Sequence, residues 1–557
     1  MAFLDKMDPD PDERQDEPGQ PSRPKAQNQH REPHLGIFTG KVGAGGPFAP
    51  VKEHWMTPQR PHPVSERKAP KTHQPSPYAR TPQKSAAAQS SQHQEPSRDA
   101  RPGKANPAKA NGAKAQLPKA YSAKGNQARQ NTAPRRPGPA PAPAKNTSRS
   151  PGALVNRRAA DRLREGYLWV YASDIESIQL ADGSAENPPA LLPVADSRGL
   201  LLGTALYSPS SQIALRLISR EAVDEAGWIE LLATRLRQAI LRRKPLLSEQ
   251  TNACRLCFSE ADELPGLIVD KYGKLVIIQL LAKGLDSAAV RGTCVRVLRE
   301  ELAPDTILER PDPRMRELEG LNTPNLEPLF VAKGEPETST QFKLNGLLFQ
   351  FDANSGQKTG AFLDQRDNYA AAQEWAQKLG ATGRALDVCC YQGGFALHLA
   401  QVCTQVTGID ASRASLEVAE RNFETNRKRM KAEVDWVEGD AFKILRDWSD
   451  ASEKFDTIVL DPPAFAKTQR AVEGALRGYK ELNLRALKML RPGGLLVTCS
   501  CSHHVGWAEL EASVASAAVD AGRRVRLLER RGAALDHPVV LNLPETEYLK
   551  CLMLQVE

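Results

Sequence analysis

The chain has 557 residues, a formal net charge of +8, 42 prolines and 38 glycines, and only 6% of its residues are aromatic. At roughly 150 residues per domain, this length allows three or four domains. The charge is uneven, because residues 1–150 hold 25 Lys and Arg against 12 Asp and Glu, which leaves 50 against 55 for residues 151–557. The basic balance therefore belongs to the first 150 residues, and the rest of the chain is not expected to be a broadly basic nucleic-acid binder.

Composition and the N-terminal sequence also exclude several classes of protein. No stretch approaches the roughly 20 apolar residues that span a bilayer, and the acidic start MAFLDKMDPDPDERQDE lacks the apolar core of a secretion signal. The nine cysteines all lie beyond residue 250, and an odd number in a large chain favours reduced thiols over a disulfide framework. We therefore expect a soluble, cytoplasmic protein that does not contact a membrane.

Residues 1–150 are rich in Pro, Gln, Ala, Ser, Lys and Arg and poor in large apolar residues. Such a segment cannot bury enough surface to offset the chain entropy lost on folding, so we expect it to be disordered. A five-residue repeat of lysines runs through it and matches neither a helix face nor a strand face: Lys104, Lys109, Lys114, Lys119 and Lys124. Two interpretations stay open, a flexible polycation that contacts RNA phosphates or a solubilising extension without a specific partner.

Short strand patterns and turns fill residues 154–222, where alternating apolar residues are separated by Pro, Gly, Asp and Ser. This pattern predicts a small β-barrel. Tyr167, Trp169 and Tyr171 alternate within it, as strand residues do. They are interpreted mainly as core residues, although aromatic side chains on a barrel can also stack with unpaired RNA bases.

Residues 223–352 combine helix and strand patterns and predict an α+β middle domain. An amphipathic helix is expected over 224–245, where Pro245 ends it, and the sequence LIVDKYGKLVIIQLL predicts a hairpin that turns at 272–274. Cys254 and Cys257 form a CxxC pair, but no second pair follows at the spacing of a zinc ribbon. A metal site is therefore not expected.

From about residue 360 onward, apolar strand patterns alternate with helix patterns. This rhythm implies a parallel sheet with helices on both faces, so residues 353–557 are expected to form an α/β, Rossmann-like domain. Ligands of such sheets bind beyond the carboxyl ends of the strands. The polar residues at those ends are therefore the candidates for a functional site.

Three of the predicted strand ends carry acidic residues that suit an adenosine-bearing cofactor. Asp387 ends the first strand and leads to Gly393 and Gly394, which let a ligand approach the backbone closely. Asp410 ends the second strand, where a carboxylate can accept hydrogen bonds from ribose hydroxyls or can cap the helix that follows. Asp440 follows the third strand and suits an exocyclic adenine amine. The three positions together favour an adenosine ligand more than any one alone.

The fourth and fifth strand ends carry groups suited to chemistry on a base. Asp461 is followed by Pro462 and Pro463, which stiffen the loop and hold the carboxylate in place. The fifth strand ends in the sequence TCSCS, which contains Cys499 and Cys501. A thiol at a strand end, facing a cleft with an acid, is a candidate nucleophile. If the strand continues, the two cysteines share one face.

Several segments of this region carry a family resemblance: KTGAFLDQRDN at 358–368, DVCCYQGGF at 387–395, LDPPAFAK at 460–467, RGYKELN at 477–483 and SCS at 500–502, with DHP at 536–538 and YLK near the C-terminus. Their order resembles that of the class I S-adenosylmethionine-dependent methyltransferases. More narrowly, it is similar to the ribosomal large-subunit RNA (cytosine-5)-methyltransferase I family. The resemblance covers about residues 154–557 and includes a first domain like a PUA domain, a small RNA-binding fold.

The resemblance implies an enzyme that forms 5-methylcytosine in large-subunit ribosomal RNA, with S-adenosylmethionine as its cofactor. It assigns the nucleophile to Cys501, although the doubled TCSCS leaves Cys499 as a second candidate. The residues it implies for cofactor binding lie at the strand ends and in the FLDQR segment: Gln365, Arg366, Asp387, Gly393, Asp410 and Asp440. Two departures stand out, because Cys389 and Tyr391 replace glycines common in methyltransferases, and Ala464 stands where some members have Lys.

The chemistry of cytosine explains these assignments. Its C5 atom is a weak nucleophile, and attack of a thiolate at C6 makes C5 reactive toward the sulfonium methyl group. Asp461 near N3 would stabilise this adduct by hydrogen bonding. No residue of the sequence identifies the base that later removes the C5 proton.

Two rival functions remain. Enzymes that methylate an exocyclic base nitrogen favour an aromatic residue directly after Asp-Pro-Pro, whereas here Ala464 intervenes before Phe465 and Cys501 would have no role. A non-catalytic RNA-binding assembly factor would keep the barrel and the basic segment without needing Cys501 or Asp461. The target nucleotide and the oligomeric state, a homodimer included, cannot be read from the sequence.

Overall fold

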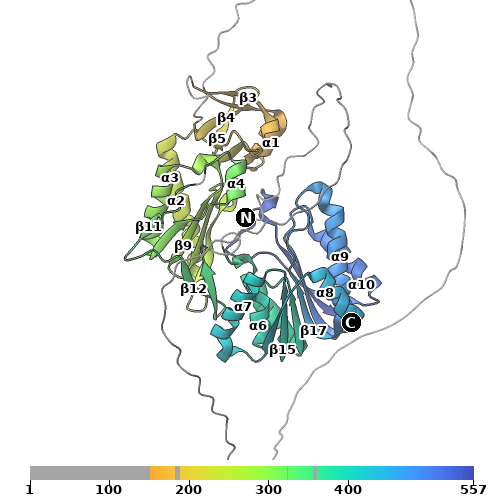
Figure 1. Ribbon diagram of the computed structural model, residues 1–557. Coiled ribbons are helices and arrows are strands. Elements are labelled where there is room, and N and C mark those ends of the chain that lie inside the picture. The colour runs from red at the N-terminus through yellow and green to blue at the C-terminus, as the bar shows by residue number, and fades with distance from the viewer. Residues whose placement is uncertain (1–150, 182–188, 323, 355–359) are drawn as a thin grey trace, which may run out of the picture. The chain divides into compact units, whose positions relative to one another are not determined.

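The structure, a computed structural model, describes residues 151–181, 189–322, 324–354 and 360–557 (Figure 1). The low-complexity segment of residues 1–150, with its lysine repeat, lies outside the described residues. Three sheets and a two-stranded hairpin organise the part of the chain that is described. No helix in that part is long and apolar enough to cross a membrane.

The first sheet has six short strands in the order β2-β6-β5-β4-β1-β3. Their bounds are β1 Gly152–Val155, β2 Trp169–Val170, β3 Ile175–Gln179, β4 Leu191–Asp196, β5 Leu201–Tyr207 and β6 Leu215–Ser219. All pairs are antiparallel except β1 with β4. The prediction of short strands separated by turns is confirmed. Trp169 is buried in the core, and its indole N–H donates to Glu260 Oε1 at 2.9 Å.

A helix that the strand pattern did not predict, α1 (Arg157–Arg164), follows β1. The side chain of Asn156 caps it by accepting a hydrogen bond from the backbone N–H of Ala159 at 2.9 Å. Its small apolar face buries Ala159 and Leu163 against the sheet. The helix is short and rich in arginine, so its apolar periodicity is too brief to be distinguished from a strand or loop.

The second sheet has the order β11-β10-β9-β8-β7, with bounds β7 Ala253–Phe258, β8 Leu267–Tyr272, β9 Leu275–Leu280, β10 Thr306–Glu309 and β11 Phe330–Val331. Helices α2 (Glu225–Arg243) and α3 (Ala288–Leu302) share an apolar cluster with it, and α4 spans Pro313–Leu318. The predicted hairpin is confirmed as β8–β9, which turns at Gly273 with φ +60°. The predicted helix is confirmed as α2.

The CxxC pair lies on β7 inside the apolar cluster shared with α2 and α3. Cys254 and Cys257 are both fully buried, and the thiol of Cys257 donates to the carbonyl oxygen of Leu267 at 3.5 Å. Burial raises the pKa of the Cys254 thiol to about 12. Both cysteines are therefore packing residues of the second sheet.

The third sheet has seven strands in the order β16-β15-β14-β17-β18-β20-β19. Their bounds are β14 Arg384–Val388, β15 Gln405–Asp410, β16 Glu433–Glu438, β17 Phe455–Leu460, β18 Leu490–Ser500, β19 Val525–Arg531 and β20 Lys550–Val556. The first five strands in chain order are parallel, as predicted. The alternating pattern did not predict the last two strands, where β20 pairs antiparallel with both β18 and β19. Nearly every residue of β20 is buried, which suits its place inside the sheet.

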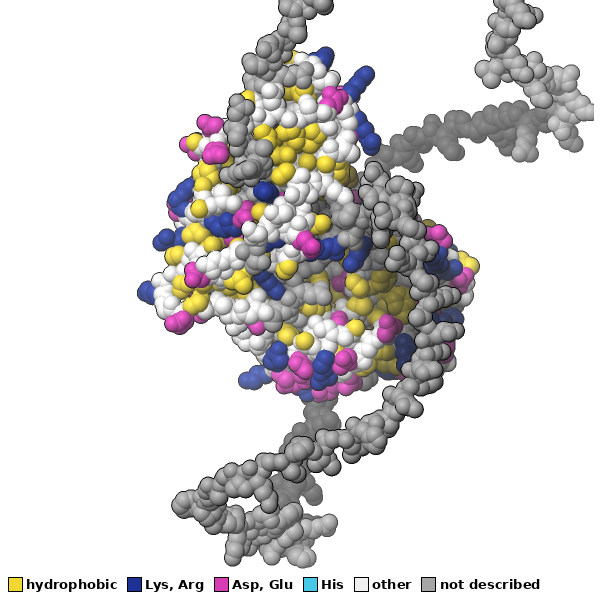
Figure 2. Space-filling view, turned by 45° about the horizontal axis from the view of Figure 1, so that its top comes forward, with side chains coloured by type: hydrophobic (Ala, Val, Ile, Leu, Met, Phe, Trp, Pro, Cys, Tyr) yellow, Lys and Arg dark blue, Asp and Glu magenta, His cyan; other side chains and the backbone are white. Residues whose placement is uncertain are grey.

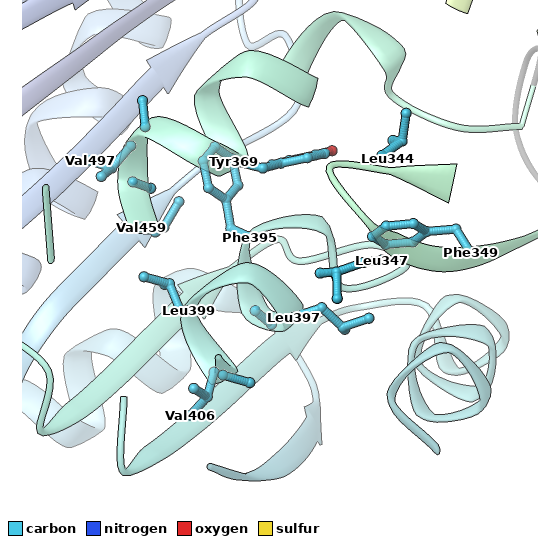
Figure 3. Close-up of a cluster of buried hydrophobic side chains, with 14 of the residues drawn as sticks. Leu344, Leu347, Phe349, Tyr369, Phe395, Leu397, Leu399, Val406, Val459 and Val497 are labelled. Atoms are coloured by element: carbon cyan, nitrogen blue, oxygen red, sulfur yellow. The ribbon is translucent and has the colours of Figure 1, made fainter. Parts of the chain in front are cut away.

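Helices cover both faces of the third sheet, as the alternating pattern predicts: α5 Arg366–Leu379, α6 Gly394–Ala400, α7 Arg413–Asn426, α8 Ala441–Asp450, α9 Val472–Met489 and α10 Trp507–Asp520. Figure 3 shows the face covered by α5 and α6, where Tyr369 and Phe395 meet Val459 and Val497. The hairpin of β12 (Ser339–Leu344) and β13 (Leu347–Asp352) packs into the same cluster. The opposite face packs against α9 and α10.

Strand β14 lies between β15 and β17, which follow it in opposite directions across the sheet. The loops beyond its carboxyl end therefore diverge and leave a crevice, the usual place for a ligand in such a sheet. Acidic and basic side chains are interspersed over the face shown in Figure 2, in keeping with the near balance of charges in residues 151–557. The crevice is thus a better guide to function than the surface charge.

A buried ion cluster around Asp536 joins the second sheet to the third. The Asp536 carboxylate accepts hydrogen bonds from the backbone N–H of Arg255 at 2.9 Å and from Arg366 Nη1 at 3.3 Å. His537 Nδ1 lies 3.2 Å from its other oxygen, and Arg243 Nη2 donates to its backbone carbonyl at 3.1 Å. The DHP segment is therefore a connection between elements far apart in the chain.

We expect Asp536→Asn to lower the free energy of unfolding by about 2–3 kcal/mol at pH 7. Burial alone would raise the pKa of Asp536, but His537, Arg366 and the Arg255 N–H outweigh burial and hold the pKa at about 2. The stabilisation is thus present above the pKa of an unfolded aspartate, about 4, and is lost as the pH falls toward 2. Denaturant unfolding at several pH values measures this, and a deficit independent of pH would contradict it. The exposed Asp520, paired with Lys480, offers Asp520→Asn as a control.

Candidate active site

The loop after β14 makes a tight turn into α6. Three of its residues have left-handed backbones: Cys389 with φ +64°, Tyr391 with φ +49° and Gly393 with φ +83°. Asp387 Oδ2 accepts a hydrogen bond from the Ala396 N–H at 2.8 Å and so ties the end of β14 to the first turn of α6. Its other oxygen, Oδ1, is buried and has no hydrogen-bond partner among the described residues. A polar group of a ligand would satisfy it.

Glycine is required twice at the start of α6. A Cβ atom at Gly394 would lie 2.3 Å from the ring of Tyr369, so the helix could not approach α5 as closely. At Gly393 a Cβ atom would lie 2.6 Å from Leu397, and the left-handed backbone disfavours any other residue. Gly393, predicted to contact a cofactor, therefore shapes the turn.

A pocket opens beside this turn, and its walls are mainly aromatic and apolar. It is lined by Phe342, Leu344, Phe349, Ala361, Phe362, Tyr369, Asp387, Cys389, Cys390, Tyr391, Gln392, Gly394, Phe395 and Asp461. The hydroxyl of Tyr391 donates to the Gly360 carbonyl at 3.0 Å, and its ring meets Phe362 edge-on. Apolar walls with few polar groups are typical of a small-molecule site. Of the predicted site residues, Asp387 and Asp461 line this pocket.

Asp410 and Asp440 lie at the ends of β15 and β16, and neither lines the pocket. Asp410 Oδ2 accepts a hydrogen bond from the Tyr391 N–H at 2.9 Å, so it supports the loop after β14. The alternative reading of Asp410 as a helix cap does not apply, because Ser412 caps α7. Asp440 does cap a helix, since its Oδ1 accepts from the Lys443 N–H at 2.8 Å at the start of α8.

The FLDQR segment places two predicted cofactor residues against other protein groups. Gln365 Nε2 donates to Asp461 Oδ2 at 3.0 Å, and its Oε1 accepts from Asn368 Nδ2 at 2.6 Å. Arg366 is buried, and its guanidinium contacts Asp367 and Asp536. Neither residue lines the pocket, so within the described residues Gln365 orients Asp461 and Arg366 belongs to the ion cluster.

Asp461 follows β17 and lies where the pocket meets the fifth strand end. Burial, together with the nearby Asp364 carboxylate, raises the pKa of Asp461 to about 7, against the opposing effect of hydrogen bonds from Gln365 and Cys499. A carboxyl group of this kind is close to half protonated at neutral pH. It can therefore both donate and accept a proton there.

The two cysteines of TCSCS lie in different surroundings and do not share a face. Cys499 is fully buried on β18 opposite Cys551 of β20, and burial raises the pKa of its thiol well above the usual range. Cys501 lies just after the end of β18 and is half-buried, with its sulfur 4.0 Å from the carbonyl oxygen of Pro462. Both thiols therefore lie near the Asp-Pro-Pro loop, Cys499 through a hydrogen bond to Asp461 and Cys501 beside the Pro462 carbonyl, and Cys501 is the less buried of the two.

Tyr479 of α9, in the RGYKELN segment, is a site residue that the sequence reasoning did not assign. Its hydroxyl accepts from Ser500 Oγ at 2.9 Å and lies 3.0 Å from Ser502 Oγ. Ser502 Oγ in turn accepts from the Ala466 N–H at 3.2 Å. These hydrogen bonds join the turn that carries Cys501 to the loop after Asp-Pro-Pro. The only sequence signal was the presence of tyrosine in a family segment.

We expect Asp387→Asn to stabilise the protein at pH 8 by about 2–4 kcal/mol relative to the wild type. Burial raises the pKa of Asp387 to about 8, with Asp461 and Asp410 adding to it against the hydrogen bond from Ala396. The wild type therefore loses stability as the pH rises from about 4 to about 8, because only the unfolded chain releases this proton freely. Unfolding by denaturant at pH 4, 6 and 8 tests this. An equal difference at all three would contradict it, and Asp435→Asn on the exposed side of β16 is the control.

Comparison with known proteins places this geometry in a family. Residues 154–220 match a PUA-like domain, and residues 326–540 match the S-adenosylmethionine-dependent methyltransferases. The ribosomal RNA large subunit methyltransferase I of Pseudoalteromonas translucida is 36% identical over 401 residues, which cover 71% of this chain and 96% of that protein. Its namesake from Erwinia tasmaniensis is 36% identical over 399 residues, which cover 71% of this chain and 97% of that protein.

The chain belongs to the ribosomal RNA large subunit methyltransferase I family. Solved structures of methyltransferases share its fold. A protein of Streptococcus mutans described as a SAM-dependent methyltransferase matches with a TM-score of 0.60 and 20% identity, covering 73% of this chain and 100% of that one. A structure of SMU.776 in complex with SAH matches with the same TM-score at 19% identity, again over 73% and 100%. The Rossmann-like third sheet and the PUA-like first sheet are thereby confirmed.

The cofactor of this family member is S-adenosylmethionine, and the pocket residues fit it. The unpartnered, buried Oδ1 of Asp387 faces a pocket whose remaining walls are aromatic and apolar. The glycine turn lets the backbone approach a ligand, as a nucleoside requires. When bound, S-adenosylmethionine supplies a methyl group on a positively charged sulfur, which a nucleophile can accept.

Proposed function

We propose that this protein transfers a methyl group from S-adenosylmethionine to C5 of a cytosine in large-subunit ribosomal RNA, through a covalent bond between Cys501 and C6 of the base. The RNA class follows from the names of the relatives, which are large-subunit ribosomal RNA methyltransferases. One observation supports the cytosine-5 chemistry above all. The sulfur of the half-buried Cys501 lies 4.0 Å from the carbonyl oxygen of Pro462. Pro462 is the residue that follows the pocket-lining Asp461 in the chain.

In the proposed reaction, the sulfur of Cys501 attacks C6 and its electron pair forms the S–C6 bond. The C5–C6 double-bond electrons become available at C5, which would take up the methyl group of S-adenosylmethionine as the methyl–sulfur bond breaks and leaves its electron pair on that sulfur. The C5 proton then leaves to a base, the C5–C6 double bond reforms, and the S–C6 bond breaks. The sulfur keeps the electron pair of the S–C6 bond, so the enzyme ends with the thiolate that attacked, and cytosine carries the methyl group.

Asp461 is proposed to act at N3 of the base. With a pKa of about 7, its carboxyl group is protonated often enough at neutral pH to donate a hydrogen bond to N3 as the thiolate adds. Gln365, which donates to Asp461 Oδ2 at 3.0 Å, would keep the other oxygen turned toward the base. The Pro462–Pro463 pair stiffens the loop that carries it.

For the cofactor, we propose that Asp410 and Asp440 supply carboxylate acceptors at the ends of β15 and β16, that Asp387 presents its buried carboxyl group at the end of β14, and that Gly393 shapes the turn. Direct contact of Gln365 and Arg366 with the cofactor stays a prediction. Their described contacts, to Asp461 and to Asp536, favour positioning roles.

We also propose the domain limits of the sequence analysis: 154–222, 223–352 and 353–557. Contact between residues 1–150 and RNA phosphates, and assembly as a homodimer, stay predictions. A chain that starts at residue 151 would reveal the first, because loss of 25 basic residues should weaken RNA binding and reduce its dependence on salt.

The experiment that tests the proposed function combines purified protein, S-adenosylmethionine with a labelled methyl group, and large-subunit ribosomal RNA from a strain that lacks the gene. Digestion to nucleosides should show the label in 5-methylcytidine. Label in an N-methylated base would support the nitrogen-methylating rival, and no transfer with intact RNA binding would support the assembly factor. RNA that carries 5-fluorocytidine at the target should remain covalently attached to the peptide that contains Cys501, because the fluorine cannot leave as a proton does.

A further inference from the structure

Lys550 is a buried cation to which the proposed reaction assigns no role. It begins β20 directly opposite Ser500 of β18, and only 2% of its surface is exposed. Its ammonium group donates to the carbonyl oxygen of Ser502 at 2.9 Å and to that of Tyr548 at 3.1 Å. The cation is therefore fixed against the turn that carries Cys501.

The two partners of this ammonium are both neutral carbonyl groups. Among the ion pairs of the described residues, none includes Lys550, so no carboxylate there lies within 4.0 Å of its nitrogen. A buried ammonium without a counter-ion is costly, because its hydration is lost and no opposite charge replaces it. A nearby anion would offset this cost.

Cys501 is the group that can supply this anion. Burial lowers the pKa of Lys550 to about 8, and the charge of a Cys501 thiolate is the strongest influence in the opposite direction, ahead of the carboxylates of Glu547 and Glu509. Lys550 therefore remains mostly protonated at neutral pH. Because Ser502 is the residue next to Cys501, the hydrogen bond to its carbonyl holds the ammonium close to the sulfur.

Two described tyrosines near Cys501 carry no positive charge, and the titratable His503 and His504 follow two and three residues later in the chain. Tyr479 of α9 and Tyr548 before β20 are neutral at pH 7, because burial raises the pKa of Tyr479 to about 12 and raises the pKa of Tyr548 well above its usual range. The Asp-Pro-Pro loop presents the Pro462 carbonyl oxygen, whose partial negative charge does not stabilise a thiolate. Lys550, fixed against the same turn, is a cationic side chain that can stabilise a thiolate there.

We propose that Lys550 holds the sulfur of Cys501 in its thiolate form and so acts as a positioning residue for the nucleophile. The thiol proton passes to solvent, because Lys550 keeps its own three protons throughout. The proposal rests on the proposed function for its purpose, the attack on C6. The relation between the two charges, however, can be measured without RNA or cofactor.

The test is the rate of Cys501 alkylation by iodoacetamide as a function of pH, followed by mass spectrometry of the Cys501 peptide in the full chain. We expect the wild-type profile to have its midpoint well below the ordinary thiol value of about 8.5. Lys550→Met should move the midpoint up by about one pH unit, which lowers the rate at pH 7 roughly tenfold. Lys550→Arg, which keeps the charge, should stay closer to the wild type. Lys480→Met removes a half-buried lysine paired with the exposed Asp520 and is the matched control, with no shift expected.

A wild-type midpoint near 8.5 would overturn the proposal by itself, even if Lys550→Met failed to fold. An unchanged midpoint in a Lys550→Met protein with native circular dichroism would also overturn it. Failure of the proposed function is separate from both results. It would appear as methyl transfer that survives in Cys501→Ala, while the alkylation profile of the wild type could still show the thiolate.

Discussion

Replacing Cys501 with alanine is expected to lower kcat for cytosine methylation at least about 1,000-fold, because C5 cannot take up a methyl group without a nucleophile at C6. Binding of S-adenosylmethionine should change little, since Cys501 does not line the pocket beside β14. Single-turnover transfer to RNA measures the first effect, and calorimetric titration with the cofactor measures the second. Retention of more than about a tenth of the rate would contradict the covalent route.

Two further cysteine variants make this result specific. Cys294→Ala makes the same change in the packed core under α3, far from the chemistry in the chain, and should keep the wild-type rate in the folded protein. Cys499→Ala should lose only about tenfold, because its buried thiol packs against Cys551 and its loss removes one hydrogen bond to Asp461 while that from Gln365 remains. If the losses of Cys499→Ala and Cys501→Ala were exchanged, Cys499 would be the nucleophile.

The second large effect is expected for Asp461→Asn, which should lower kcat/KM by about 100- to 10,000-fold, the usual contribution of a general acid–base group. In the wild type, kcat/KM should also fall as the pH rises through about 7, because burial and the Asp364 carboxylate raise the pKa of Asp461 to about 7 and only the protonated form donates to N3. In Asp461→Asn, kcat/KM should not show this fall at high pH. Rates measured between pH 6 and 9 with saturating cofactor test both statements.

Stability gives an independent check on Asp461. Since its pKa is raised on folding, the wild type loses stability as the pH rises from about 4 through about 7, and Asp461→Asn should remove that part of the loss. Asp435→Asn, on an exposed position of β16, should reproduce neither the kinetic nor the stability change. If kcat/KM of Asp461→Asn still fell as the pH rose through about 7, the titrating group would be one other than Asp461.

Much of the third sheet could be predicted because its signals are local. Each parallel strand is an apolar run followed by a helix, so β14 to β18 could be placed from the pattern of residues alone. The position of β20 between β18 and β19 could not, because pairing between strands far apart in the chain has no local signature. Helix α1 was missed for a related reason, since eight residues rich in arginine carry too little periodicity.

For the residues of the candidate site, position along the chain could be predicted but contacts could not. Asp387, Asp461 and Cys501 stand at strand ends, and strand ends can be recognised in the sequence. What each side chain contacts could not be recognised, because the partners are distant in the chain. Arg366 meets Asp536 across 170 residues, and Lys550 meets Ser502 across 48. The choice between Cys499 and Cys501 likewise depended on where β18 stops, which is a property of its pairing with β20.

The ion cluster around Asp536 affects how the protein unfolds. Arg243 and Arg255 belong to elements of the second sheet, Arg366 begins α5, and all three converge on one loop between β19 and β20. If either sheet separated from this loop, a charged side chain would be left unpaired in an apolar interior. Heating should therefore melt residues 223–557 in a single cooperative step, rather than releasing the catalytic half while its neighbour stays folded.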